Sequence, residues 1–355
     1  MYVSVQWLRG LAAAMVVYFH ATLMVQEHID PTIQAATLGA AGVDLFFVIS
    51  GFIMATTTGN SQGRRSADVR QFLFRRFVRV MPMYWGATGA KLAIVLAMPH
   101  LALHSTVTVP YVLSSLMLVP MANNDGHVMP LLVVGWTLSY EAFFYITFAL
   151  SMGTRLGAVR LTTFVFALFA LLGTFLPLAT WADPLSLLSP LLLEFLFGMW
   201  IAAALKTKLT LSTSVAVLCA FFAMACLGAT SMLSPESCYQ YRTVLWGVPS
   251  ALFLLSVVVL EQKRGHIKET FFRLLGDASY STYLVHCFTL PLVGRVFAKL
   301  VSVGVLLPNA VMVLTGIAVS LASGVVIHLY LERPLLERLR GLWPTPSTAN
   351  MRAAP

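Results

Sequence analysis

The sequence predicts an all-α polytopic integral membrane protein, with about ten transmembrane helices in one bundle. Hydrophobic residues make up 58% of the 355-residue chain and charged residues only 10%. A soluble domain carries about 25% charged residues, so this composition excludes an ordinary soluble enzyme. The hydrophobic residues are also grouped in long runs separated by short polar segments, as expected when each run crosses the bilayer as a helix.

Ten hydrophobic runs are long enough to cross about 30 Å of hydrocarbon. They occupy residues 6–26, 40–58, 82–99, 131–152, 160–178, 185–205, 211–232, 242–260, 277–298 and 309–331. We expect them to form one transmembrane domain over residues 1–340, followed by a disordered cytoplasmic tail at residues 341–355.

Basic residues gather on one side of this predicted topology. With the N-terminus in the cytoplasm, eighteen of the 23 Lys and Arg residues fall in cytoplasmic segments. Only Arg242, Arg295 and Lys299 fall on the opposite side, and Arg9 and Lys91 lie within the runs. This bias follows the positive-inside rule and predicts that both termini are cytoplasmic. The net charge of +9 is thereby explained by loops beside membrane lipids, without a nucleic-acid partner. The four cysteines lack metal-ligand spacing, so we expect no metal site.

The first run places Arg9 and His20 on one helical face. Eleven residues turn a helix to roughly 20° past three full turns and advance it by about 16 Å. A cation and an imidazole on one face of a membrane helix indicate a polar interior and a functional site. The alternative is that Arg9 snorkels to the headgroups and His20 lies at the opposite interface.

The second and third runs add an acid and a cluster of bases. Asp44 lies near the external end of its run, as a functional acid, an interfacial cap or the partner of a cation. Arg75, Arg76 and Arg79 crowd the cytoplasmic end of the next helix, where guanidinium groups suit either phosphate or anionic lipid. Lys91, deeper in that helix, could meet an acid or a phosphate, or could snorkel.

The fourth run carries a polar stripe at helical spacing. Thr137, Glu141 and Tyr145 recur every four residues, so they share one face of an otherwise apolar helix. A carboxylate at this depth needs a partner, and His20 and Arg9 are the candidates, in a catalytic arrangement or a structural ion pair.

The ninth run carries a second polar face, which either lines a substrate cavity or forms interhelical hydrogen bonds. Its members are Ser279, Thr282, Tyr283 and His286.

In these motifs the chain resembles the acyltransferase 3 family of membrane acyltransferases, particularly its exopolysaccharide and O-antigen O-acetyltransferase members. The likeness covers nearly the whole chain and rests on four motifs in order. They are Arg9 eleven positions before His20, Gly42-Val-Asp-Leu-Phe-Phe-Val-Ile-Ser-Gly, Arg75-Arg-Phe-Val-Arg-Val-Met-Pro-Met-Tyr-Trp, and Trp136-Thr-Leu-Ser-Tyr-Glu-Ala-Phe-Phe-Tyr.

The resemblance implies an O-acyltransferase of the bacterial inner membrane, with acetyl-CoA or another acyl-CoA as donor and a cell-surface or lipid-linked glycan as acceptor. On this hypothesis His20 is the general base, Glu141 orients it, and Arg9 holds the donor or stabilises the oxyanion, with Asp44 also in the catalytic set. An acyl-histidine intermediate is a second alternative that these residues leave open.

The remaining residues of the hypothesis bind substrates. Arg75, Arg76, Arg79 and Lys91 would bind the phosphates of CoA. The substrate-lining residues would be Tyr145, Ser279, Tyr283 and His286.

Two other classes of protein share some of these features. A transporter or flippase for a glycan or lipid intermediate would also carry buried Arg, His, Glu and Lys, although no related pair of halves is visible in the sequence. A structural membrane subunit would leave the polar stripes unexplained.

Overall fold

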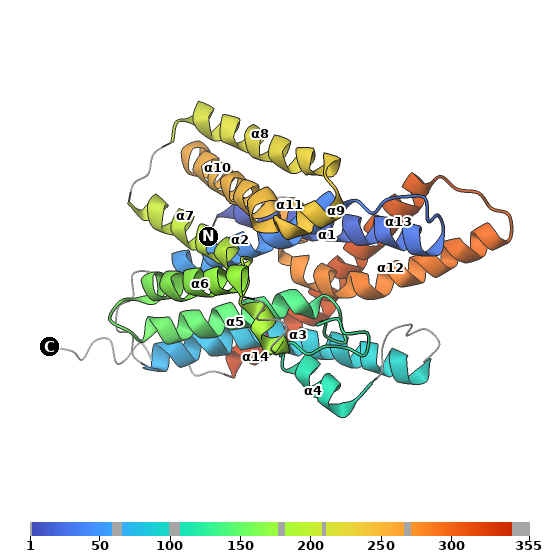
Figure 1. The fold of residues 1–355 in the computed structure, drawn as a ribbon, viewed down its shortest axis with the longest axis horizontal. Coiled ribbons are helices and arrows are strands. Elements are labelled where there is room, and N and C mark those ends of the chain that lie inside the picture. Colours follow the sequence, from blue (N-terminus) through green and yellow to red (C-terminus); the bar gives the residue numbers. More distant parts are fainter. Residues whose placement is uncertain are drawn as a thin grey trace.

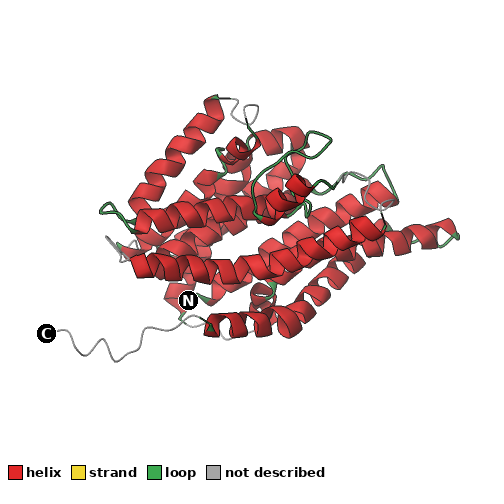
Figure 2. Ribbon diagram, turned by 90° about the horizontal axis from the view of Figure 1, so that it is seen from below, coloured by secondary structure: helices red, strands yellow, loops and turns green. Residues whose placement is uncertain are grey.

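The computed structural model describes residues 2–58, 66–98, 107–176, 182–207, 211–265 and 271–342. Within these ranges the chain is helical, with no strand and a single isolated β-bridge between Ala122 and Val128 (Figure 2). The predicted all-α membrane fold is confirmed. The predicted tail lies beyond the described residues, except for Gly341 and Leu342, which close the last helix.

The helices follow one another along the chain, and the connection between residues 117 and 134 is the longest that lies wholly in the described ranges. The first half of the chain contains α1 (Val3–His28), η1 (Thr37–Ala40), α2 (Ala41–Thr58), α3 (Ser66–Ala97), α4 (Val109–Leu116), α5 (Gly135–Met152) and α6 (Ala158–Phe175). The second half contains η4 (Asp183–Leu187), α7 (Leu192–Lys206), α8 (Thr213–Ala229), η5 (Thr230–Met232), α9 (Pro235–Gln240), η6 (Thr243–Gly247), α10 (Val248–Arg264), α11 (Phe271–Asp277), α12 (Ser279–Ser302), α13 (Asn309–Ile327), η7 (His328–Glu332) and α14 (Arg333–Gly341).

Nine helical segments of the described residues are long and apolar enough to cross a membrane. They cover nine of the ten predicted runs, and α5 occupies the remaining one, residues 131–152. Although α5 has 18 residues, it is not among the nine because its first two turns carry Thr137, Ser139 and Glu141. These polar residues are tolerated because the helix packs inside the bundle, where other side chains meet them.

Helices α1 and α2 form the centre of the bundle. Helix α1 packs against α2, α11, α12 and α13, and α2 packs most extensively against α7. The α2 and α7 backbones approach closely at Gly51 and Gly198, where a Cβ atom on either glycine would collide with a carbonyl oxygen of the other helix. Small residues at such crossings are typical of helix association in membranes.

The other helices surround this centre (Figure 1). Helices α12 and α13 lie side by side and extend to one side of the molecule, α8 lies beside α10, and α3 packs against α5. Ring contacts join the α2, α5 and α7 helices: Phe47 stacks on Phe195 and Phe144 lies tilted against Phe195, with centroids 4.6 Å apart in both pairs. This aromatic packing fixes the faces of α2 and α5 that carry Ser50 and Glu141.

Candidate functional site

A cavity of about 120 Å³ lies between α1, α2, α3, α5 and α12. Its wall includes Arg9 of α1, Arg76 and Arg79 of α3, and Glu141 of α5, and we refer to it as the arginine cavity. Three guanidinium groups against one carboxylate give its wall an excess of positive charge. Such a charge excess in a low-dielectric site favours an anionic ligand.

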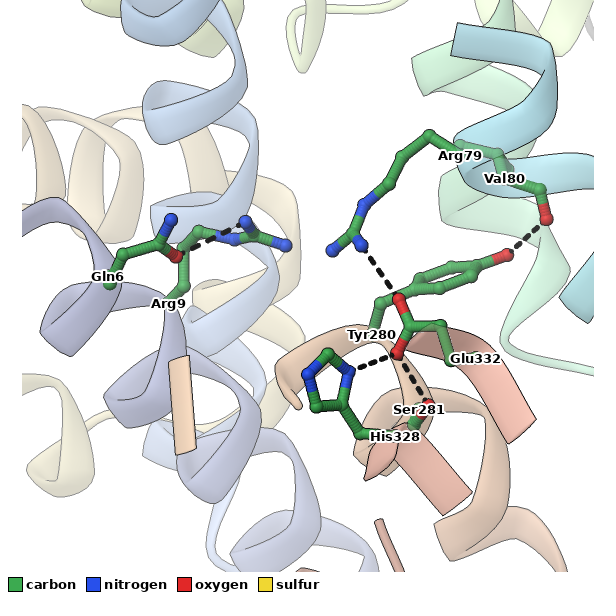
Figure 3. A network of polar contacts seen from close by, with 8 residues as sticks. All are labelled: Gln6, Arg9, Arg79, Val80, Tyr280, Ser281, His328 and Glu332. Carbon is green, nitrogen blue, oxygen red and sulfur yellow. Dashed lines mark hydrogen bonds and ion pairs between the residues drawn. The ribbon is translucent and has the colours of Figure 1, made fainter. Parts of the chain in front are cut away.

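Arg9 and Arg79 extend toward one another from opposite sides of this cavity (Figure 3). Arg9 Nη1 donates a hydrogen bond to Gln6 Oε1 at 3.3 Å. Arg79 Nη1 forms an ion pair with Glu332 Oε1 at 2.7 Å. The two guanidinium groups are therefore held by residues on their own sides, and the space between them is available for an anion.

Arg76 lines the arginine cavity, whereas Arg75 does not. The Arg76 guanidinium lies over the rings of Phe72 and Tyr145, 5.5 and 5.7 Å from their centroids, and its buried Nε atom has no hydrogen-bond partner. Arg75 is exposed. The expectation that all three arginines share one surface is therefore not met.

Lys91 is also separate from the arginine cavity. It is half-buried on α3, twelve residues beyond Arg79, which corresponds to about 18 Å along the helix axis. The structure thus divides the expected phosphate-binding set, bringing Arg76 and Arg79 together with Arg9 and leaving Arg75 and Lys91 outside.

Glu141 is bonded to uncharged neighbours. Its carboxylate accepts a hydrogen bond from Ser50 Oγ at 3.3 Å and another from the hydroxyl of Tyr145. Of its two expected partners, Arg9 lines the same cavity, whereas His20 does not. The structure therefore does not show Glu141 orienting His20.

A second cavity, of about 1050 Å³, lies toward the other end of the bundle. Its wall includes His20 and Arg242, and we refer to it as the histidine cavity. Aromatic side chains make up much of the remaining wall, including Phe19, Trp136, Tyr140, Tyr239 and Tyr241. Val43 and Tyr283 line both cavities, so these two residues lie at the boundary between the arginine cavity and the histidine cavity.

The tautomer of His20 is determined by its backbone contact. His20 Nδ1 lies 2.9 Å from the carbonyl oxygen of Val16, one turn earlier. Because a carbonyl can only accept, Nδ1 carries the hydrogen of a neutral ring, and the Nε2 lone pair is available as a base.

His286 is the nearest aromatic neighbour of His20 on α12. The two ring centroids are 4.8 Å apart, and His286 is 1% exposed. His286 Nδ1 lies 3.3 Å from the carbonyl oxygen of Thr282, so its neutral ring has the same tautomer as His20. The predicted polar face of the ninth run is therefore directed partly at His20.

Ser279 and Tyr283 of that face were also predicted to line the substrate site. Each of them lines a cavity. Tyr283 shares a hydrogen bond of 2.7 Å with Thr137 Oγ1 of α5. Ser279 lines the arginine cavity, and its buried Oγ has no hydrogen-bond partner. Tyr145, predicted from α5, lines the same cavity.

Asp44 is fully buried and paired with Arg242. Arg242 Nε and Nη2 donate to the two carboxylate oxygens at 2.8 and 2.9 Å. The guanidinium group also lies between two indoles, 5.4 Å from the Trp136 centroid and 5.3 Å from that of Trp246. The structure therefore shows the cation-partner alternative for Asp44.

Sequence reasoning missed the importance of Arg242 and Glu332. In the sequence, Arg242 is one of three basic residues on the external side, and nothing near Glu332 marks it as the partner of Arg79. Both belong to buried ion pairs, and π-helical turns begin just after Arg242 and end at Glu332. The unpartnered acid Asp44 was the one available signal, since it required a cation from elsewhere in the chain.

No group of His, Cys, Asp and Glu residues in the described ranges has the geometry of a metal site.

Over residues 2–329 the chain matches a family model described as an acyltransferase domain. The chain belongs to this acyltransferase family. The family predicted from the four motifs is confirmed, and the protein is an integral membrane O-acyltransferase.

Two curated proteins are similar to the chain over most of its length. It is 34% identical to the exopolysaccharide production protein ExoZ of Rhizobium meliloti (strain 1021), over 94% of this chain and 99% of the relative. It is 24% identical to the acyltransferase MdmB of Streptomyces mycarofaciens, over 90% of this chain and 87% of the relative. No solved structure gave a significant match.

Proposed function

We propose that the protein transfers an acyl group, acetyl in the simplest case, from acyl-CoA to a hydroxyl of a cell-surface or lipid-linked glycan. The observation that supports this most directly is the pair of cavities that share Val43 and Tyr283. One cavity carries guanidinium groups suited to an anionic donor, and the other carries His20. A two-substrate transfer needs this arrangement of separate sites with a common boundary.

The phosphate groups of the donor bind at the arginine cavity, whose volume of about 120 Å³ is too small for a whole acyl-CoA molecule. Arg9, Arg76 and Arg79 supply charged N–H donors, which are the preferred partners of phosphate. The abundance of basic residues in the loops at this end supports placing it in the cytoplasm, where acyl-CoA is made. Both termini are then cytoplasmic, and the protein lies in the inner membrane of a bacterium.

The acceptor binds in the histidine cavity. Its volume of about 1050 Å³ exceeds what one small molecule needs, and its aromatic wall suits the apolar faces of sugar rings. The similarity to a protein named for exopolysaccharide production supports a glycan as the acceptor.

His20 acts as the general base in direct transfer. Its Nε2 takes the proton of the acceptor hydroxyl as the hydroxyl oxygen attacks the thioester carbonyl, and the carbon–sulfur bond then breaks. The proton passes from His20 to the departing CoA sulfur, which restores the neutral imidazole. Arg9, which lines the arginine cavity about 16 Å from His20 along α1, is assigned to the donor phosphates and not to the oxyanion of the tetrahedral intermediate.

The proposal is tested with purified protein in nanodiscs, labelled acetyl-CoA and a glycan acceptor. We expect label transfer with release of CoA by the wild type, and CoA binding without turnover by His20→Ala. Full transfer by His20→Ala at equal expression would overturn the role of His20. A folded wild type that binds no acyl-CoA would overturn the proposed donor.

A further inference from the structure

Glu332 is fully buried behind Arg79, and both of its carboxylate oxygens are occupied (Figure 3). Oε1 accepts from Arg79 Nη1 at 2.7 Å. Oε2 accepts from Ser281 Oγ at 2.7 Å and contacts His328 Nδ1 at 2.8 Å. The carboxylate is thus held by α12 and by its own π-helical turn, while it holds a side chain of α3.

These contacts restrict the Arg79 side chain. Its guanidinium carbon also lies 5.7 Å from the centroid of the Tyr280 ring. The Tyr280 hydroxyl donates to the carbonyl oxygen of Val80 at 2.7 Å, which joins α12 to α3 beside Arg79. An arginine with three rotatable methylene groups is therefore held in one orientation before any ligand binds, and that orientation faces Arg9.

We propose that Glu332 is the positioning residue of the donor site. It holds Arg79 so that the guanidinium groups of Arg79 and Arg9 face one another and bind a phosphate or diphosphate group between them. The identification of that anion with the donor rests on the proposed function above, whereas the positioning itself rests on the contacts of Glu332.

The electrostatics favour this role over a purely structural ion pair. Two guanidinium groups that face each other in a low-dielectric cavity repel, and an anion between them converts that repulsion into two attractions. Glu332 contacts Arg79 from behind and does not line the cavity, so it leaves the facing side of Arg79 open to a ligand. An Arg79–Glu332 ion pair that only stabilised the fold would not require the Arg79 guanidinium to face the guanidinium of Arg9.

The test compares Glu332→Gln with Glu337→Gln in full-length protein in nanodiscs. Glu337 is a matched control, because its carboxylate pairs with Arg333 on the exposed side of α14, where both side chains are more than 60% exposed. We expect Glu332→Gln to weaken binding of CoA, and to raise the KM for acetyl-CoA, by at least about tenfold, with kcat at saturating donor changed by less than about threefold. Glu337→Gln should match the wild type in all three quantities.

A double-mutant cycle with Arg79→Gln separates positioning from a structural effect. If Glu332 acts through Arg79, Glu332→Gln should cause no further loss of CoA affinity when Arg79 is already Gln. Additive losses, or unchanged CoA affinity in a folded Glu332→Gln protein, would overturn the proposal. If Glu332→Gln does not fold, Ser281→Ala is the second variant, because it removes one hydrogen bond to the Glu332 carboxylate. Ser281→Ala should also weaken CoA binding, and unchanged CoA affinity in Ser281→Ala would overturn the proposal.

Inorganic pyrophosphate serves as a second probe, independent of the identity of the donor. Pyrophosphate binding that depends on both Arg79 and Glu332, in a protein that neither binds nor uses acyl-CoA, would support the positioning role and refute the proposed donor. Pyrophosphate binding that is unaffected by Glu332→Gln would refute the positioning role.

Discussion

His20 of α1 and His286 of α12 lie against one another at the centre of the protein, with ring centroids 4.8 Å apart. Both Nδ1 atoms are directed at backbone carbonyl oxygens of their own helices, so neither Nε2 carries a hydrogen when the rings are neutral. His20 alone of the two lines the histidine cavity. The geometry therefore gives the two imidazoles different roles, His20 toward the acceptor and His286 as the side chain packed beside it.

The two histidines should differ in their contribution to turnover. We expect His20→Ala to lower kcat by about 10²- to 10⁴-fold, the usual contribution of a general base, with CoA affinity unchanged. His286→Phe keeps a ring against His20 and should retain kcat within about tenfold of the wild type. Steady-state kinetics on both variants checks this, and an equal loss in His286→Phe would assign proton transfer to the second imidazole.

Neighbouring arginines on α3 should have unequal effects on donor binding. Arg76 lines the arginine cavity, whereas Arg75 is exposed. We expect Arg76→Ala to weaken CoA binding by at least about tenfold, because a charge-assisted contact with phosphate is lost. Arg75→Ala, measured by the same titration, should change it by less than about twofold. If Arg75→Ala weakened CoA binding as much as Arg76→Ala, the arginine cavity would not be the phosphate site.

The Asp44–Arg242 pair should be important for stability. Asp44→Asn removes the carboxylate that accepts two hydrogen bonds from Arg242 and leaves Glu194 as the buried carboxyl nearby, so we expect it to lower the free energy of unfolding by about 3 kcal/mol. The neutral double variant Asp44→Asn/Arg242→Gln should recover part of that loss. Denaturant titration in detergent measures both. Arg333→Ala, which breaks an exposed pair, should cost only about 0–1 kcal/mol. If Asp44→Asn and Arg333→Ala lost similar stability, the Asp44–Arg242 pair would not be the more stabilising of the two.

Asp30 should give the connection after α1 a dependence on acid pH. Hydrogen bonds from Thr32 and from Asn309, at the start of α13, lower the pKa of Asp30 below its ordinary value. A lowered folded-state pKa stabilises the folded protein above the unfolded pKa, and that stabilisation is lost as pH falls through the folded value, below about pH 4.

The Asp30 prediction is checked by thermal unfolding in detergent between pH 3 and pH 7. The wild type should lose more stability at the acid end than Asp30→Asn, whose amide does not titrate in this range. Parallel losses in the two proteins would show that Asp30 makes no contribution.

Local periodicity predicted much of the fold and part of the candidate site. The hydrophobic runs identified the membrane helices because each must cover the same bilayer thickness. The spacing of Arg9 and His20 placed them on one helical face, and the structure has both within α1. The stripe through Glu141 and Tyr145 was predicted in the same way, and the structure places both on the arginine cavity.

The choice of partners could not be predicted from the sequence. Asp44 pairs with Arg242, 198 positions away, and Arg79 pairs with Glu332, 253 positions away. Periodicity specifies which way a side chain points on its own helix, but it carries no information about which helix packs on that face. For the same reason Glu141 was open to either His20 or Arg9, and the cavity wall assigns it to the side of Arg9.

The sequence by itself determined that this is a helical membrane protein with polar faces directed into its bundle, since burying charge in lipid is too costly for any other arrangement. Only the tertiary structure decided that those faces form two cavities that meet at Val43 and Tyr283. The physical reason is that a cavity is a property of packed helices, set by which side chains leave space between them, and that depends on contacts between residues far apart in the chain.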